Sequence, residues 1–294
     1  MSKAYREYDP ATLETIQRIE LSMLKDFDAL CRKHGIRYFA DSGTAIGAVR
    51  HHGMIPWDDD IDLCLPREDY DRFRAVAETE YGDKYFLLDA HSAPEYPLMT
   101  GRWCLRGTVF HEEGLRGVRA PFGIFLDLYC LDALPDDEKE ARRQWLHGWF
   151  WGKLMVLRQV RSPVIYVKGV RAAALRAACF LGHYALRLFT TKAFLLRRTE
   201  KWILRCRGRK TKRVYYSFAP RPYRNSYVLD EVFPTHDEDF GGVRIPVSGC
   251  NDAYLRRIFG DYMTLPPPEK RHNHPPWKLD FGPYAPAADV PARP

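Results

Sequence analysis

The chain has 294 residues, 46% hydrophobic and 28% charged, a globular composition that excludes collagen-like, fibrous and fully disordered classes. Its 45 Lys and Arg against 38 Asp and Glu give a net charge of +7. The polar start of the chain predicts no secretory segment, and no run of about 18 uncharged apolar residues predicts a membrane-spanning helix. The seven scattered cysteines contain no CxxC motif and indicate a reducing compartment, with most of them serving as small core residues.

The charge is distributed unevenly along the chain. Residues 141–213 contain 19 Lys and Arg and a single acid, Glu200, so this segment carries +18 while the remainder carries −11. The sequence therefore describes an acidic body that contains a strongly basic segment.

The first half of the chain predicts alternating helices and strands. A helix begins at Asp9-Pro10, follows apolar residues at three- and four-residue steps and ends at Gly35. Residues 36–40 predict a strand, residues 42–44 a tight turn and residues 45–50 a short helix. The remaining elements of this half are strands over 61–65, 85–88, 103–110 and 123–131 and a helix from 66 to about 80.

The second half begins with a helical, basic pattern from residue 136 to about 213, interrupted near 162–163. Short segments at 215–218, 228 and 242–247, a helix over 251–259 and a Pro-rich tail from 266 follow. We predict an α/β (α+β) protein with a catalytic core over 1–135 and a basic amphipathic helical insertion over 136–213. Residues 214–282 would pack back on the core, and 283–294 would form a flexible Pro/Ala-rich tail.

The run Trp57-Asp58-Asp59-Asp60-Ile61-Asp62 is the strongest chemical feature of the sequence. Because Asp60 and Asp62 differ by two positions, a strand would project both carboxylates from one face. Two such carboxylates suit Mg²⁺, which completes its shell with water and phosphate oxygens. The alternative is an acidic loop that caps the next element.

Two further features favour the metal site. Ser42-Gly43-Thr44 follows a predicted strand and opens a helix, where backbone N–H groups can approach a phosphate. Asp127 lies in the middle of the most apolar predicted strand, where an acid is costly unless it is paired or binds a metal. Together these features match the plan of a metal-dependent phosphoryl-transfer site.

The long run from Tyr38 to Tyr70, with its SGTAIGAVRHHGMIPWDDDID core, resembles the signature of the LicD family. That family includes bacterial phosphocholine transferases and is related to fukutin-type ribitol-phosphate transferases. Weaker matching blocks lie at 108–110, 125–132 and 259–271, whereas the basic middle segment matches poorly. The family commonly has Gly-Gly-Thr where this chain has Ser42-Gly43-Thr44.

The resemblance implies a nucleotidyltransferase-like fold, a mixed sheet flanked by helices. It also implies Mg²⁺-dependent transfer of a phospho-alcohol from a CDP-activated donor to a sugar hydroxyl, with release of CMP. Phosphocholine is the first expectation for the transferred group, with ribitol or glycerol phosphate as the others, and Mn²⁺ is a second option for the metal. The rivals are a true nucleotidyltransferase that releases pyrophosphate and a non-catalytic binding module of the same fold.

The resemblance also implies roles for individual residues. Asp60, Asp62 and Asp127 would hold the metal, and Asp127 would also take the proton of the acceptor hydroxyl. Ser42, Gly43 and Thr44 would contact phosphate. Arg50 would bind phosphate or pair with Asp58 or Asp59, and these two acids would orient the metal ligands.

Other residues are expected to contact the substrates. Arg102 and Thr108 would contact the nucleotide, and Lys270, Arg271 and His274 would close over the substrate. The aromatic candidates for a choline group are Trp57, Trp103 and Tyr129.

The basic segment carries its own expectation. Tryptophans and other apolar residues alternate with Arg and Lys, a pattern that suits an anionic membrane surface. The alternatives are a solvated basic face and a groove for an acidic substrate; nucleic acid is not expected as a partner. The expected acceptor is a cell-surface glycan or its lipid-linked precursor, modified by an enzyme peripheral on the cytoplasmic face of the membrane.

Overall fold

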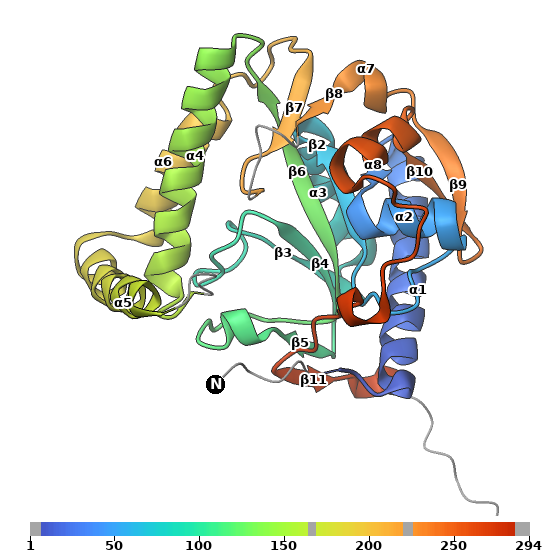
Figure 1. Ribbon diagram of the computed structural model, residues 1–294, viewed down its shortest axis with the longest axis horizontal. Coiled ribbons are helices and arrows are strands. Elements are labelled where there is room, and N and C mark those ends of the chain that lie inside the picture. Colours follow the sequence, from blue (N-terminus) through green and yellow to red (C-terminus); the bar gives the residue numbers. More distant parts are fainter. Residues whose placement is uncertain (1–6, 164–168, 220–225, 286–294) are drawn as a thin grey trace, which may run out of the picture.

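The computed structural model describes residues 7–163, 169–219 and 226–285 (Figure 1). The elements of the first half are α1 (Pro10–His34), β1 (Phe39–Ala40), α2 (Ser42–His51), β2 (Asp62–Pro66), α3 (Arg67–Tyr81), β3 (Tyr85–Leu88), β4 (Gly101–Leu105), β5 (Val109–His111), η1 (Glu113–Leu115) and β6 (Phe125–Leu134). Those of the second half are α4 (Glu138–Gln159), α5 (Val170–Phe189), α6 (Lys192–Ile203), β7 (Arg213–Tyr216), β8 (Tyr227–Val228), α7 (Leu229–Val232), β9 (His236–Phe240), β10 (Val243–Val247), α8 (Asn251–Phe259), η2 (Pro268–Lys270), β11 (Lys278–Asp280) and η3 (Gly282–Tyr284).

A mixed sheet organises the core. Its order is β3-β4-β6-β2-β1-β10-β9, and β7 continues the β4 side of β6 and pairs with β8. The pairs β2–β6 and β1–β10 are parallel and the other pairs are antiparallel. The predicted α/β class is therefore confirmed.

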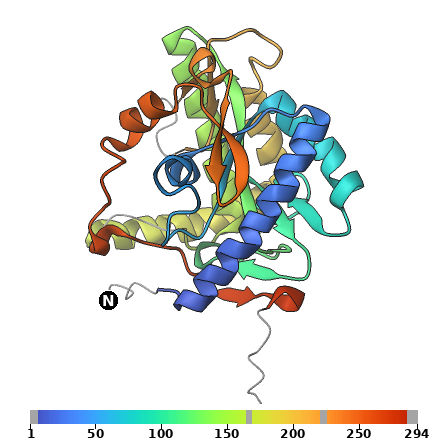
Figure 2. The ribbon, with the colours of Figure 1, turned by 90° about the vertical axis from the view of Figure 1, so that its right-hand side faces the viewer.

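Helices cover both faces of this sheet. Helices α1 and α3 pack on one face, and Figure 2 shows α1 crossing the strands with its N-terminal end near β11. Helices α2 and α8 contribute a second, smaller core on the opposite face. Helices α4, α5 and α6 pack against one another as a separate layer beside the sheet (Figure 1). Of the described helices, none combines the length and the apolar character needed to cross a bilayer.

Several predicted boundaries move for identifiable reasons. The predicted turn at 42–44 is the first turn of α2. Strand β1 begins only at Phe39, because the amide of Ile36 still donates to the carbonyl of Cys31 at the C-terminal end of α1. The predicted strand 103–110 is two strands, because Gly107, at φ 79°, turns the chain between β4 and β5.

Other predictions match closely. Asp9 caps α1 and Gly35 ends it in the left-handed region, while β3 and α8 have the predicted bounds. All seven cysteines are free and five are buried, as expected. The division into units at 135, 213 and 282 stays a prediction, and residues 286–294 of the predicted tail lie outside the described residues.

Candidate active site

The three acids expected to hold a metal lie together on one face of the sheet. Asp62 opens β2 and lies opposite Asp127 of β6 in the parallel register, and Asp60 precedes β2 by two residues. One carboxylate oxygen from each of the three lies within 4.8 Å of the others. The alternate residues Leu63 and Leu128 enter the core under α1 and α3, so strand alternation directs the acids to the opposite face.

The surroundings of these acids disfavour the ionised form of all three carboxyl groups. Burial, reinforced by the neighbouring carboxylates, raises the pKa of Asp60 to about 7 and that of Asp62 well above its ordinary value. Burial also raises the pKa of Asp127 to about 7, although Arg102 acts in the other direction. Oδ1 of Asp62 is buried and has no hydrogen-bond partner within the described part of the chain. A hard divalent cation would neutralise the cluster and occupy this oxygen, so the donor set fits Mg²⁺.

Arg102 of β4 positions Asp127 from the adjacent strand. Its Nε donates to Oδ1 of Asp127 at 3.0 Å, and Nη1 pairs with Glu112. The guanidinium also lies 3.9 Å from the ring centroid of Phe125 and is 4% exposed. These contacts make Arg102 a positioning residue for Asp127, and they bring in Glu112, which sequence reasoning missed.

The start of α2 lies beside the acids. The hydroxyl of Thr44 accepts a hydrogen bond from the amide of Asp62 at 2.8 Å, so the helix fixes the first residue of β2. Ser42 has a φ of 47°, in the left-handed region that glycine occupies most easily. A Cβ on Gly43 would lie 2.5 Å from Oδ2 of Asp58, so a larger residue at this position would displace the Asp58 carboxylate.

Asp41, which the sequence analysis did not single out, anchors this end of α2. Its carboxylate accepts hydrogen bonds from the hydroxyls of Tyr227 at 2.8 Å, of Tyr254 and of Ser42 at 3.0 Å. Its amide donates to the carbonyl of Asp62 at 3.0 Å. The tyrosines come from β8 and α8, so no local pattern around residue 41 indicates their role.

The two other acids of the run have structural partners. Asp59 accepts from the hydroxyl of Tyr8 at 2.8 Å and from the amide of His274 at 3.0 Å, and it is 3% exposed. This hydrogen-bonded carboxylate raises the pKa of His274 to about 9. Burial and Asp59 raise the pKa of Asp58 to about 6, and Gln17 of α1 donates to its carbonyl at 2.8 Å.

Basic residues approach the site from α2 and from the segment after α8. Arg50 donates to the carbonyl of Tyr262 and is not paired with Asp58 or Asp59 in the described structure, and its binding of phosphate stays a prediction. Arg271 lies over the ring of Trp57, 4.7 Å from its centroid, and burial together with Arg271 lowers the pKa of Arg50. Two guanidinium groups therefore share one neighbourhood, while Lys270 is exposed in η2.

Two of the expected contacts, Thr108 and Trp103, have other surroundings, whereas Tyr129 lies near the acids. The hydroxyl of Thr108 donates to the carbonyl of Leu105 at 2.8 Å and accepts from the amide of Ile124 at 2.9 Å. Trp103 is buried in the core, where its ring lies 3.9 Å from that of Tyr85. Tyr129 lies on the same face of β6 as Asp127, with its ring 4.9 Å from that of Tyr216. Of the aromatic candidates, Trp103 is therefore enclosed, and Tyr129 lies near the acids.

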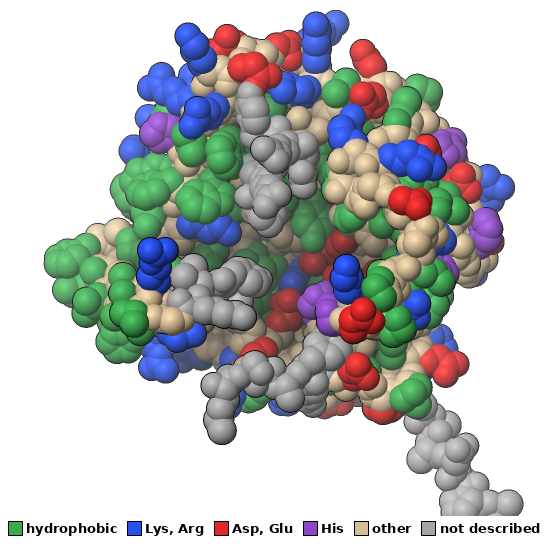
Figure 3. Space-filling model, viewed as in Figure 1, with side chains coloured by type: hydrophobic (Ala, Val, Ile, Leu, Met, Phe, Trp, Pro, Cys, Tyr) green, Lys and Arg blue, Asp and Glu red, His purple; other side chains and the backbone are tan. Residues whose placement is uncertain are grey.

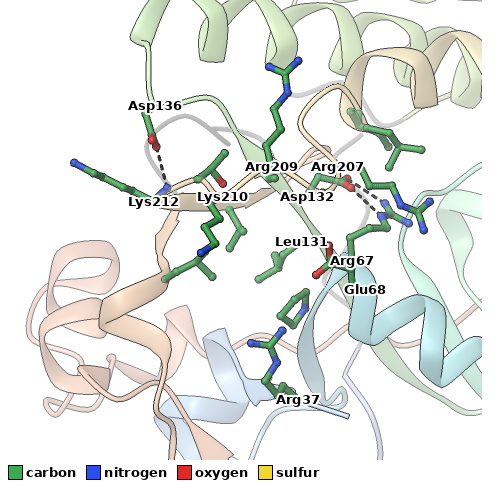
Figure 4. Close-up of a pocket in the computed structure, with 18 of the residues that line it drawn as sticks. Arg37, Arg67, Glu68, Leu131, Asp132, Asp136, Arg207, Arg209, Lys210 and Lys212 are labelled. Carbon is green, nitrogen blue, oxygen red and sulfur yellow. Dashed lines mark hydrogen bonds and ion pairs between the residues drawn. The ribbon is translucent and has the colours of Figure 1, made fainter. Parts of the chain in front are cut away.

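Figure 3 shows acidic side chains within a hollow between the helical layer and the core. Figure 4 shows a different pocket, of about 510 Å³, at the other end of β2 and β6. There Arg67 pairs with Asp132 at 2.8 Å, and Asp136 accepts from the amide of Lys212 at 2.9 Å. We assign no ligand to this second pocket.

Comparison with known proteins gives a consistent result. Residues 35–97 match the family model described as LicD/FKTN/FKRP, nucleotidyltransferase domain. The chain is 26% identical over 282 residues to the lipopolysaccharide cholinephosphotransferase LicD of Haemophilus influenzae, a match that spans 90% of this chain and 96% of that protein. An uncharacterized Rickettsia typhi protein, RT0683, is 33% identical over 50% of this chain and 43% of its own length. Human ribitol 5-phosphate transferase FKRP is 40% identical over 48 residues, or 16% of this chain and 10% of FKRP.

Proposed function

From the premise that this chain is a LicD-family homologue, we propose that it transfers a phospho-alcohol from a CDP-activated donor to a sugar hydroxyl and releases CMP. The observation that carries the proposal is the convergence of Asp60, Asp62 and Asp127 on one face of the sheet, beside the start of α2. In the balanced reaction, the acceptor oxygen bonds to the phosphorus of the phospho-alcohol and the phosphorus–oxygen bond to CMP breaks.

Asp60, Asp62 and Asp127 would hold Mg²⁺, or Mn²⁺ in its place, which neutralises charge on the donor phosphates when bound. Gly43 and the first amides of α2 would approach the same phosphates, since a helix N-terminus favours an anion. Arg50 would place a positive charge in the last turn of α2, at the opposite end of the helix from Gly43. The hydroxyl proton of the acceptor would pass to the carboxylate of Asp127, which Arg102 holds in place.

The transferred group is proposed to be phosphocholine, with ribitol or glycerol phosphate as the alternatives. Of the relatives, one is named a cholinephosphotransferase and another a ribitol 5-phosphate transferase. The quaternary ammonium of choline is recognised by aromatic faces, and Tyr129 with Tyr216 offers aromatic rings beside Asp127. The acceptor is proposed to be a surface glycan or its lipid-linked precursor, met at the cytoplasmic face of an anionic membrane.

The test is a screen of purified protein with Mg²⁺ and CDP-choline, CDP-ribitol, CDP-glycerol, CTP or ATP. Thermal stability identifies the ligand, since a ligand at 100 times its dissociation constant adds about 2.7 kcal/mol. Product analysis then separates the reactions: CMP supports the transferase, and pyrophosphate supports a nucleotidyltransferase. Asp127→Asn should remove turnover while keeping the fold. If the wild type binds none of these ligands, a non-catalytic binding module becomes the better description.

A further inference from the structure

Helix α5 exposes apolar side chains on its outer face. The large hydrophobic residues that are exposed in the described structure concentrate in α4, α5 and α6, and α5 alone contributes seven. Val170, Leu181 and Leu188 are 88%, 69% and 77% exposed. Figure 3 shows hydrophobic side chains gathered where Figure 1 places α5. A surface helix of a soluble domain normally has the reverse arrangement, with its apolar stripe toward the core.

Three of the seven exposed apolar residues of α5 form a line along one side of the helix. At 100° per residue, Val170, Leu181 and Leu188 fall within about 20° of one line. The two buried residues, Ala172 and His183, lie on the opposite side, where Nδ1 of His183 contacts the carbonyl of Leu157 in α4 at 2.9 Å. Arg171 and Arg187 fall about 100° to either side of this line, at the borders of the exposed apolar face, while Arg176 falls nearer the buried side.

We propose that α5 lies in the plane of an anionic lipid surface, with its outer face among the acyl chains and its arginines at the phosphates. An apolar face bordered by cations is the pattern of an interfacial helix, because long basic side chains reach the headgroups while apolar ones enter the lipid. Residues 170–189 contain no acid, and residues 141–213 contain only Glu200. The charge of the whole segment therefore complements anionic headgroups.

The charge pattern argues against a second copy of the chain as the occupant. If two α5 helices packed face to face, their arginine borders would approach each other, and α5 supplies no acid to pair with them. An anionic lipid surface would bury the apolar face and pair its phosphates with the arginines at the borders. This inference deepens the proposed function, on which it rests for the location of the acceptor.

Docking through α5 would also place a neighbouring pocket beside the headgroups. This pocket, of about 900 Å³, lies between α5, the end of α4 and the η1 region. Arg116, Arg161 and Arg187 contribute to its lining, and Arg187 belongs to the border of the apolar face as well. A lipid-linked acceptor held at the membrane would thus meet the enzyme on the same side as these cations.

The test measures co-flotation of the full chain with vesicles of equal parts phosphatidylglycerol and phosphatidylcholine, and with vesicles of phosphatidylcholine alone. The wild type should bind the anionic vesicles at least tenfold more tightly. The double variant Leu181→Glu/Leu188→Glu should lose at least tenfold of that binding. Phe259→Glu, which adds charge at an exposed apolar residue of α8, is the matched control and should bind as the wild type does.

Circular dichroism and CDP-choline binding with Mg²⁺ accompany each variant. If the double variant still binds CDP-choline but no longer floats with the vesicles, the role of α5 is supported. If the wild type itself does not bind CDP-choline, the proposed function is contradicted, but the flotation result still tests α5. Flotation of the double variant equal to that of the wild type would overturn the inference. The inference would also be overturned if the wild type bound neither vesicle type and sedimented as a dimer while the double variant sedimented as a monomer.

Discussion

Replacing one acid of the candidate metal site should stabilise the metal-free protein. Asp62 is the best position, because its carboxylate lies within 4.8 Å of those of Asp60 and Asp127 and its Oδ1 is buried without a donor among the described residues. Two unit charges at that separation repel by about 3 kcal/mol at an effective dielectric constant of about 20. Burial is the largest cause of the pKa of about 7 for Asp60 and Asp127, and burial also raises the pKa of Asp62 itself.

The sign of the pH dependence follows from these raised values. A carboxyl group with a folded pKa above its unfolded value contributes stability that is complete below about pH 4 and lost as the pH rises through about 7. With a chelator present, the wild type should therefore lose stability between pH 5 and pH 8.5. Asp62→Asn should lose less over this interval, and its free energy of unfolding at pH 8.5 should exceed that of the wild type by about 2 kcal/mol.

Urea denaturation at pH 5 and pH 8.5, with chelator and with excess Mg²⁺, measures the effect. Mg²⁺ should stabilise the wild type and leave Asp62→Asn nearly unchanged. Asp69→Asn is the matched control, because Asp69 of α3 is a buried acid outside the cluster that pairs with Arg37 at 2.8 Å, and losing this ion pair should cost about 1–3 kcal/mol. The reasoning is refuted if Asp62→Asn is the less stable protein at pH 8.5 in chelator, or if it has the same pH dependence as the wild type.

Three further changes test the surroundings of the site. Ser42→Gly should raise the melting temperature and increase the free energy of unfolding by about 0.5–1 kcal/mol. Glycine adopts the φ of 47° without strain, and this gain outweighs the loss of one hydrogen bond to Asp41. An unchanged or lower melting temperature would contradict this reasoning. Tyr254→Phe should lower the free energy of unfolding in urea by about 1–2 kcal/mol, because Asp41 loses a donor, and a neutral effect would show that the contact contributes nothing. His274→Gln should cost more stability at pH 6 than at pH 10, because a pKa raised to about 9 beside Asp59 gives stability that disappears above that pH; equal costs in thermal melts would rule out the ion pair.

The sequence predicted the acidic cluster because its parts depend on local patterns. Strand alternation directs Asp60 and Asp62 to one face, and an acid within an apolar strand identifies Asp127. The partners of Asp127 and Asp41 were not predictable in the same way. Arg102 reaches Asp127 through strand pairing, and Tyr254 reaches Asp41 across 213 residues of chain. Such contacts follow from topology, which hydrophobic periodicity does not specify.

Secondary structure shows the same division between local and distant causes. Helix α1 was predictable from its cap at Asp9 and its end at Gly35. Strand β9 was missed because it reads His-Asp-Glu-Asp-Phe, with little apolar alternation, and it forms by pairing with β10 at the edge of the sheet. The amphipathic character of the segment that contains α5 was predicted, but its orientation was not, since periodicity gives the faces of a helix but not which one meets the protein.

The position of β10 has a consequence for how the molecule is made. It lies between β1 and β9, pairing Ala40 with Val247, so β1 lacks one of its two neighbouring strands until more than 240 residues have left the ribosome. The segment that reaches Asp59 through His274 is synthesised later still. Until then α1 lacks its contacts with β10 and Asp59 lacks the amide of His274, and pairings of such long sequence separation form slowly. The nascent chain should therefore expose an unfinished sheet edge and unpaired acids during most of its synthesis, a period in which chaperone binding would protect it from aggregation.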